Sequence, residues 1–274
     1  MNKQENISNT QKVPFRGFRG LTTQELSIGY KKSKTLFIVQ QNINVELKKS
    51  EVVCLIGPNG CGKSTLLRTL GGLQKALAGN IFVNGQDFTT LSIASKALLM
   101  SFVLTEQVSI GKMTVREMVA LGRYPHTDWA GNLSEKDAQI INESIALVHL
   151  DHKINEFFNE LSDGEKQRVM IAKALAQDTP IVLLDEPTAH LDLPNRVEIM
   201  LLLRKLAKQT GKSVLLSTHE LDLALQTAHN IWLMTHEKII CGLPEELVGN
   251  GSLQMVFQNK SIRFDEKGKV SIIK

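Results

Sequence analysis

Cysteine, aromatic residues and long apolar runs are all scarce in this sequence of 274 residues. The three cysteines, Cys54, Cys61 and Cys241, are odd in number and lack the spacing of a metal site, so they indicate reduced thiols rather than a disulfide framework. The longest apolar stretches, such as residues 181–184 and 214–216, have only the length of a strand. A helix that crosses a bilayer needs about 18 or more apolar residues. We therefore expect another chain to form any membrane passage.

A strong charge bias is also missing. The 32 Lys and Arg residues exceed the 28 Asp and Glu residues by four, which gives a net charge of +4. This charge is too mild to predict nucleic-acid binding, although it suits a protein that rests near an anionic membrane surface. Residues 1–22 are rich in Asn, Gln and Arg and lack periodicity, which predicts a flexible leader, and residues 1–12 have no apolar core, which argues against a signal peptide.

Strand and helix patterns alternate along the rest of the chain. Residues 25–47 contain short stretches of alternating polar and apolar residues that predict antiparallel strands. Residues from about 106 to 165 keep helical spacing and predict a small helical subdomain. On both sides of that subdomain, strand-length runs alternate with helical patterns, which is typical of an α/β fold with a mainly parallel sheet covered by helices. Residues 249–274 predict a strand extension at the C-terminus.

One segment fits the phosphate-loop pattern G-x-x-x-x-G-K-[ST]. A buried-strand pattern precedes it and a helical pattern follows it, which is the context that the motif requires. In such a loop, glycines let backbone N–H groups turn toward a phosphate, and the positive end of the following helix points to the same place. The expected nucleotide-binding residues are Gly57, Pro58, Asn59, Gly60, Cys61, Gly62, Lys63, Ser64 and Thr65.

Four side chains near this loop predict the chemistry of phosphate transfer. Lys63 can reach the β- and γ-phosphates of ATP, and the Ser64 hydroxyl can hold Mg²⁺. Asp185 and Glu186 follow four apolar residues of a second strand pattern. In phosphate-loop proteins the Asp at such a strand end helps to hold Mg²⁺. Glu186, one residue further, is placed to act as general base toward an attacking water.

Residues 161–165, Leu-Ser-Asp-Gly-Glu, then resemble the signature sequence L-S-G-G-Q of the ATP-binding cassette (ABC) family, and the resemblance covers residues 25–247. Ser162 and Glu165 also fit a capping box at a helix start, and both interpretations hold together because a helix N-terminus binds phosphate as readily as it accepts a cap. The resemblance implies that Ser162, Gly164 and Glu165 serve the γ-phosphate bound to the opposite subunit. Asp163 and Glu165 depart from the more common Gly and Gln of the family.

The same resemblance implies roles for further residues. Tyr30, just after the first strand pattern, matches the aromatic residue that stacks on adenine. Leu191 and Asp192 match the loop that crosses the dimer interface. His219, in the sequence Ser-Thr-His at 217–219, matches the switch histidine that contacts the γ-phosphate. Together with Lys63 and Glu186, His219 completes the expected catalytic set.

One position departs from the family pattern. The family usually has a Gln that contacts Mg²⁺ at the end of the strand pattern at residues 101–104. Our alignment puts Thr105 there, followed by Glu106 and Gln107. Thr105 can keep an oxygen on the metal, or Gln107 can reach the metal if the loop is shifted. The sequence leaves both alternatives open.

The resemblance also implies an assembly. It predicts an ATPase domain at residues 23–248, a head-to-tail homodimer, ATP as substrate and Mg²⁺ as cofactor. The partners would be separate transmembrane permease subunits and, indirectly, a substrate-binding protein, with no nucleic acid. The expected location is peripheral, on the cytoplasmic face of the inner membrane.

The cargo is suggested by residues 121–126, Leu-Gly-Arg-Tyr-Pro-His. They resemble a segment in ATPases of importers for ferric siderophores, haem and cobalamin, and we expect a ferric siderophore, with haem or cobalamin as alternatives. A non-transport ABC protein would have a second cassette or long coiled coils, and the sequence has neither. A soluble phosphate-loop kinase would leave residues 161–165 and His219 unexplained.

Overall fold

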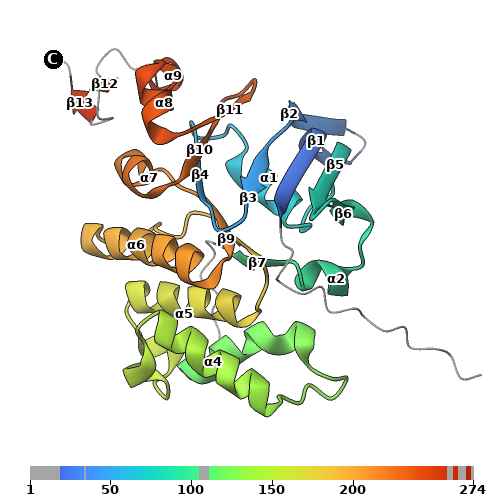
Figure 1. Cartoon of the computed structure of the whole chain (residues 1–274), viewed down its shortest axis with the longest axis vertical. Coiled ribbons are helices and arrows are strands. Elements are labelled where there is room, and N and C mark those ends of the chain that lie inside the picture. The colour runs from blue at the N-terminus through green and yellow to red at the C-terminus, as the bar shows by residue number, and fades with distance from the viewer. Residues whose placement is uncertain (1–18, 34, 105–110, 258–261, 265–269, 273–274) are drawn as a thin grey trace, which may run out of the picture.

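Parallel strands form the centre of the protein in the computed structural model, which describes residues 19–33, 35–104, 111–257, 262–264 and 270–272 (Figure 1). In this sheet β10, β4, β9, β8 and β7 follow one another in parallel, and β11 adds an antiparallel edge beside β10. The strands span Ile239–Gly242 (β11), Asn230–Met234 (β10), Val52–Ile56 (β4), Ser213–Ser217 (β9), Ile181–Leu184 (β8) and Met100–Val103 (β7). The expected α/β fold with a mainly parallel sheet is confirmed.

The central strands are apolar because both of their faces are covered. Successive side chains of a strand point to opposite faces. In β4, Val52 and Cys54 accordingly belong to one core, together with residues of helices α3 to α7, whereas Val53 and Leu55 belong to a second core with α1 and the N-terminal strands. All five residues of β4 are buried. A charged side chain can therefore appear only where such a strand ends.

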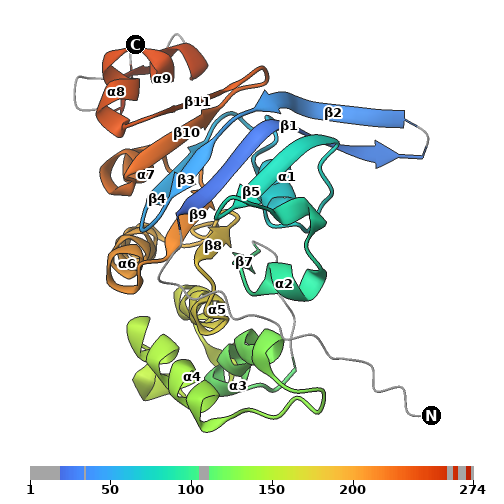
Figure 2. The same ribbon diagram turned by 45° about the vertical axis from the view of Figure 1, so that its right-hand side comes forward.

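A second, antiparallel sheet covers one of these faces (Figure 2). Its order is β2-β1-β5-β6, and β3 pairs with β1 beside this path. The strands span Gly20–Lys32 (β1), Thr35–Ile43 (β2), Glu46–Lys48 (β3), Ala78–Val83 (β5) and Gln86–Asp87 (β6). The antiparallel strands that we predicted from residues 25–47 are thus present.

The sequence-based boundary of the leader is wrong by at least three residues. β1 begins at Gly20, inside the segment 1–22 that we assigned to the leader, and Leu21 is fully buried and pairs with both Leu47 and Val83. The residues around Leu21 do not alternate between polar and apolar and so gave no strand signal, and the burial of Leu21 arises only from strands that come later in the chain. Residues 1–18 lie outside the described residues.

Nine helices are present among the described residues (Figures 1 and 2). α1 follows β4 directly, and α3, α4 and α5 pack together at the end of the molecule beyond β7. They span Lys63–Leu70 (α1), Ile93–Ala97 (α2), Val115–Ala120 (α3), Glu135–Leu147 (α4), Asp163–Ala176 (α5), Leu193–Thr210 (α6), Leu221–Thr227 (α7), Pro244–Gly249 (α8) and Ser252–Val256 (α9). In the described ranges no helix is long and apolar enough to cross a membrane.

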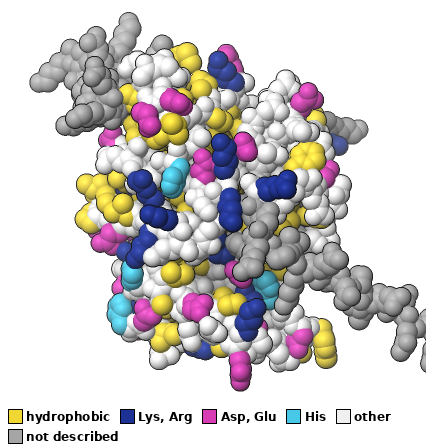
Figure 3. All heavy atoms as spheres, in the orientation of Figure 1, with side chains coloured by type: hydrophobic (Ala, Val, Ile, Leu, Met, Phe, Trp, Pro, Cys, Tyr) yellow, Lys and Arg dark blue, Asp and Glu magenta, His cyan; other side chains and the backbone are white. Residues whose placement is uncertain are grey.

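The C-terminal extension does not consist of strands alone. It begins with α9, and only then come the paired strands β12 (Ile262–Phe264) and β13 (Val270–Ile272). The helix is five residues long and its one buried side chain is Leu253, so it has too little periodicity to be recognised from sequence. Apolar side chains gather over α8 and α9 at the upper end of the face in Figure 3.

Residues 121–126 form a 3-10 turn that packs against the C-terminal end of α5 and binds its carbonyl groups. The backbone of Gly122 lies so close to α5 that an added Cβ would be 2.2 Å from the Lys173 carbonyl oxygen. The buried Arg123 donates from Nη1 to the Ala176 carbonyl oxygen (2.7 Å) and from Nε to Asp137 Oδ1 (2.8 Å). His126 Nε2 lies 2.8 Å from the Gln177 carbonyl oxygen. These contacts satisfy carbonyl groups that a helix end leaves without intrahelical partners.

The Arg123–Asp137 pair generates a stability prediction. The variant Arg123→Met leaves the buried Asp137 carboxylate without its cation, and we expect the free energy of unfolding to fall by about 3–5 kcal/mol. Urea unfolding measures this loss. Arg116→Met is the matched control, since Arg116 is less buried and bonds the neutral Asn142, and it should lose far less. Equal losses in the two variants would contradict the assignment.

The pH dependence adds a second readout. Burial raises the pKa of Asp137, but hydrogen bonds from Ser134 and the Arg123 contact outweigh burial and lower the pKa from 3.8 to about 2. A carboxyl whose pKa is lower in the folded state stabilises the protein above its unfolded pKa, and this contribution is lost as the pH falls. The difference between wild type and Arg123→Met should therefore shrink as the pH falls from about 4 to 2.

Candidate nucleotide-binding site

Three strand ends meet at one edge of the parallel sheet. Leu55 of β4 pairs with Ser217 of β9, and Leu184 of β8 pairs with Leu216 of β9. Because these strands are parallel, the residues that follow them emerge side by side. The phosphate loop, the two acidic residues and the segment 217–219 are thereby brought together, as the order of motifs in the sequence predicted.

The phosphate loop turns from β4 into α1 through glycines in the left-handed region. Gly60 has φ 78° and Gly62, which precedes α1, has φ 109°. A side chain at Gly62 would also collide with Val39, because an added Cβ would lie 2.3 Å from its Cγ1 atom. The loop therefore needs glycine for its conformation and for its contact with β2.

Lys63 is the first residue of α1, and its side chain folds back over the loop. Its Nζ atom donates to the carbonyl oxygens of Gly57 (2.9 Å) and Pro58 (3.2 Å), and the residue is only 6% exposed. The Cys61 thiol is buried, and this burial raises its pKa. A thiol that stays protonated is no nucleophile. The loop thus presents a cation and backbone groups, with Asn59 exposed and Thr65 half-buried on the first turn of the helix.

Asp185 joins the three strand ends. Its Oδ1 atom accepts hydrogen bonds from Ser64 Oγ (3.0 Å) and from Ser217 Oγ (2.7 Å), while its backbone N–H donates to the Val103 carbonyl oxygen (2.9 Å). The hydroxyl and carboxylate oxygens expected to hold Mg²⁺ therefore lie within hydrogen-bond distance of each other. Hard oxygen donors of this kind suit Mg²⁺.

Glu186 contacts His219 through its side chain and Ser217 through its backbone. The Glu186 Oε1 atom is 2.6 Å from His219 Nε2. Glu186 has a φ of 48°, which is uncommon for a residue with a side chain, and its backbone N–H donates to Ser217 Oγ (2.9 Å). Ser217 thus contacts both acidic residues. The sequence interpretation gave it no role, although its place at a buried strand end was the signal that could have identified it.

The signature segment opens α5 with a capping box. Ser162 Oγ accepts from the backbone N–H of Glu165 (3.4 Å), and Glu165 Oε2 accepts from the backbone N–H (2.9 Å) and hydroxyl (2.8 Å) of Ser162. Lys153 Nζ lies 2.9 Å from Glu165 Oε1. The hydrogen bond from Lys153, with those from Ser162, lowers the pKa of Glu165 to about 2 despite the opposing effect of burial. Gly164 packs against the Asn195 side chain at the start of α6.

The signature and the phosphate loop lie on different elements, at the start of α5 and at the start of α1. Among the described residues, no hydrogen bond or ion pair joins Ser162, Gly164 or Glu165 to residues 57–65. Tyr30, in contrast, lies in β1 and pairs with β2, and β2 contacts the phosphate loop through Val39. It is 51% exposed. Thr105, Glu106 and Gln107 lie outside the described residues.

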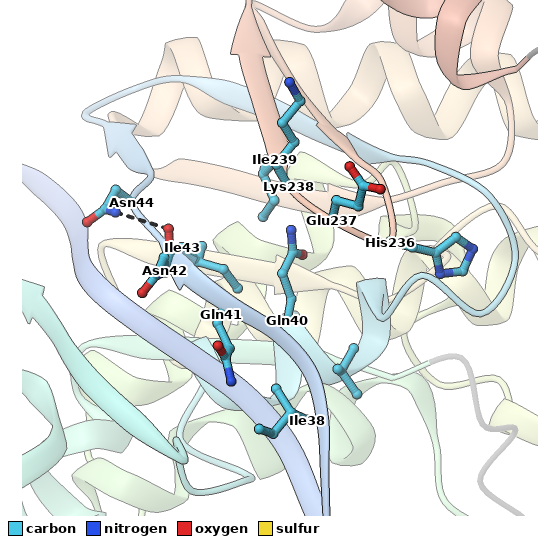
Figure 4. Close-up of a pocket in the computed structure, with 11 residues that line it drawn as sticks. Ile38, Gln40, Gln41, Asn42, Ile43, Asn44, His236, Glu237, Lys238 and Ile239 are labelled. Carbon is cyan, nitrogen blue, oxygen red and sulfur yellow. Dashed lines mark hydrogen bonds between the residues drawn. The ribbon is translucent and has the colours of Figure 1, made fainter.

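A cavity of about 640 Å³ lies between β2 and the turn that joins β10 to β11 (Figure 4). None of the predicted site residues lines it. Gln40 is 4% exposed on its wall, and neither atom of its side-chain amide has a partner among the described residues. A buried polar group without a partner costs free energy.

This amide provides a second stability prediction. Gln40→Met keeps the length of the side chain and removes the polar group, so the free energy of unfolding should rise by about 1 kcal/mol in a urea titration. Gln41→Met is the matched control on the exposed side of the same strand and should change the stability by less than about 0.5 kcal/mol. A loss of stability in Gln40→Met alone would mean that the amide has partners in solution.

Comparison with known proteins identifies the class of protein that this geometry defines. The family model described as ABC transporter matches residues 40–189, just over half of the chain. The chain belongs to the ABC transporter family, and its enzymatic activity is ATP hydrolysis coupled to transport.

Individual relatives are similar over most of their length. The achromobactin transport ATP-binding protein of Dickeya dadantii is 37% identical over 86% of this chain and 87% of that protein. The iron(3+)-hydroxamate import ATP-binding protein of Bacillus subtilis is 34% identical over 87% of both. A solved inward-facing structure of a metal-chelate type ABC transporter matches with a TM-score of 0.75 and 26% identity, covering 93% of this chain and 97% of that one.

The position of Lys63 predicts a selective loss of ATP binding. Lys63→Ala would remove the expected charge-assisted contact with phosphate, and a contact of this kind is typically worth about 1.5–3 kcal/mol. We expect ATP affinity to fall by about ten- to a hundredfold, as measured by fluorescence titration with a labelled ATP analogue. Lys75→Ala, an exposed lysine shortly after α1, is the control and should bind normally. Unchanged affinity in Lys63→Ala would remove residues 57–64 from the nucleotide site.

Proposed function

We propose that this protein powers the import of a ferric siderophore through a separate membrane permease. The observation that carries the ATPase half of this proposal is the meeting of Lys63, Asp185 and Glu186 at one sheet edge. The cargo half rests on the similarity to the achromobactin and iron(3+)-hydroxamate proteins and on the segment at residues 121–126. Haem and cobalamin are the alternative cargoes.

In the proposed reaction, a water oxygen attacks the γ-phosphorus of ATP, the bond to the β-phosphate oxygen breaks, and Glu186 accepts a proton from the water. The contact between Glu186 and His219 supports this assignment, because His219 would hold the carboxylate in place and reach the γ-phosphate. Lys63 would offset the negative charge that develops on the phosphate oxygens.

Ser64 and Asp185 are the residues that would hold Mg²⁺, with Thr105 as a further expected ligand. When bound, the ion would offset the negative charge that develops on the phosphates. Ser217 supports the arrangement, because its hydroxyl donates to Asp185 and fixes the carboxylate.

The separation of the two phosphate-binding segments supports a head-to-tail homodimer. No hydrogen bond or ion pair among the described residues joins Ser162, Gly164 or Glu165 to the phosphate loop, so they would serve ATP held by the opposite subunit. Binding of ATP would close the dimer, and hydrolysis would release it, which gives the two states that a permease can follow. Lys153 offsets the charge of Glu165, so the signature would approach phosphate without an unbalanced carboxylate.

The proposed partners follow from the cargo. Permease subunits would dock near the segment 105–107 and the helical subdomain, on the cytoplasmic face of the membrane, and a substrate-binding protein would deliver the iron chelate from the other side. The solved structure whose match covers 93% of this chain is that of a metal-chelate type ABC transporter, which supports these partners.

The test is uptake of labelled ferric siderophore, haem and cobalamin by cells with wild-type protein, Glu186→Gln or the exposed control Glu237→Gln. Glu186→Gln retains ATP binding but lacks the base, so we expect siderophore uptake to fall at least tenfold and the purified variant to form a dimer in ATP. Loss of haem or cobalamin uptake instead would change the cargo. Normal uptake of all three, with ATPase activity still lost, would reject the importer assignment alone.

A further inference from the structure

Two aromatic rings face each other across the β1–β2 hairpin. Tyr30 and Phe37 occupy directly opposite positions in the strand register. Their ring centroids are 5.3 Å apart, and the planes are inclined by 19°, so the rings are stacked. Both remain widely exposed, Tyr30 at 51% and Phe37 at 43%. One face of the Tyr30 ring is therefore covered by Phe37, and the other is available to a ligand.

This part of the hairpin has little other support. β1 pairs with β3 only at residues 20–22 and with β5 no further than Ser27, so from Gly29 onward its only strand partner among the described residues is β2, beside a hydrogen bond from the Gln74 side chain to the Gly29 carbonyl oxygen. A two-stranded ribbon has only marginal stability by itself. Cross-strand side-chain pairs then determine how its residues are held. Phe37 is the ring that restricts the orientation of Tyr30.

The strand that carries Phe37 also contacts the phosphate loop. The register slips between the pairs Ile28–Gln40 and Gly29–Ile38, so Val39 is an extra residue, a β-bulge. Bulges redirect a side chain, and Val39 packs on Gly62 at the start of α1. The bulge therefore fixes the ring pair relative to the phosphate loop, since Phe37 is only two residues, about 7 Å of strand, from that contact.

We infer that Phe37 is a positioning residue for the nucleobase: it holds the Tyr30 ring so that the open face of that ring receives adenine. This inference rests on the proposed stacking of Tyr30 on adenine. Phe37 itself does not touch the reacting atoms. By restricting the ring before ATP arrives, it lowers the entropy lost on binding.

The experiment compares ATP hydrolysis by the complete chain and its variants. Phe37→Ala should raise KM for ATP by about two- to tenfold, the range expected for the loss of one aromatic pair, with kcat unchanged. Inhibition by inorganic tripolyphosphate, which has no base, should be unchanged. Phe37→Tyr should restore the wild-type KM. Leu36→Ala is the matched control, because Leu36 is exposed to a similar degree, 53%, and points to the other face of the ribbon.

A second set of variants tests whether Phe37 acts through Tyr30. Tyr30→Ala should raise KM, and adding Phe37→Ala to that background should change it no further. A normal KM in Phe37→Ala beside a raised KM in Tyr30→Ala overturns the role of Phe37 and leaves that of Tyr30. The role is also overturned if Phe37→Ala weakens tripolyphosphate inhibition or still raises KM without Tyr30. A normal KM in Tyr30→Ala rejects the stacking of Tyr30 and the inference together.

Discussion

The carboxylate of Asp185 is the group on which the site depends. It accepts from Ser64, at the start of α1, and from Ser217, at the end of β9, while its own backbone donates to β7. Three strands, β7, β8 and β9, and helix α1 are thereby held at one charged position. The apolar strands of the sheet are covered on both faces, which excludes water from their length. A charged position is therefore stable only at the edge where these strands end together. The paired Glu186 and His219 lie beyond that edge, where they are reached from solvent.

The signature region follows a different principle, in which local hydrogen bonds and charge balance set the end of a helix. Ser162 and Glu165 satisfy each other's backbone groups, and Lys153 offsets the carboxylate. The departure of Glu165 from the more common Gln is therefore accompanied by a cation from a neighbouring turn. At the opposite end of the same helix, Arg123 and His126 satisfy carbonyl groups, and Gln177 donates to the carbonyl oxygens of Ala97 and Met100. Both ends of α5 are thus fixed to their surroundings.

Residues 121–126 illustrate how one motif can have a structural explanation beside a functional one. The Gly is required because the chain approaches α5 closely, and the Arg is buried with Asp137 and a helix carbonyl. These contacts explain why such residues stand at these positions without reference to any cargo. The similarity to siderophore-import proteins supports the cargo independently, because it extends over most of the chain.

The fold class and the order of the motifs could be predicted from the amino-acid sequence alone, because buried strands, glycine turns and capping residues leave local patterns. On that basis Lys63 could be placed at the start of a helix, and Asp185, Glu186 and His219 just after strands, and the structure brings these segments together. Four further features became evident only from the three-dimensional arrangement: the contacts of Ser217, the cation beside Glu165, the burial of Leu21 and the stacking of Phe37 on Tyr30. Each of these features depends on a partner distant in sequence or on the register between two strands. Local sequence patterns do not reveal which distant residues pair.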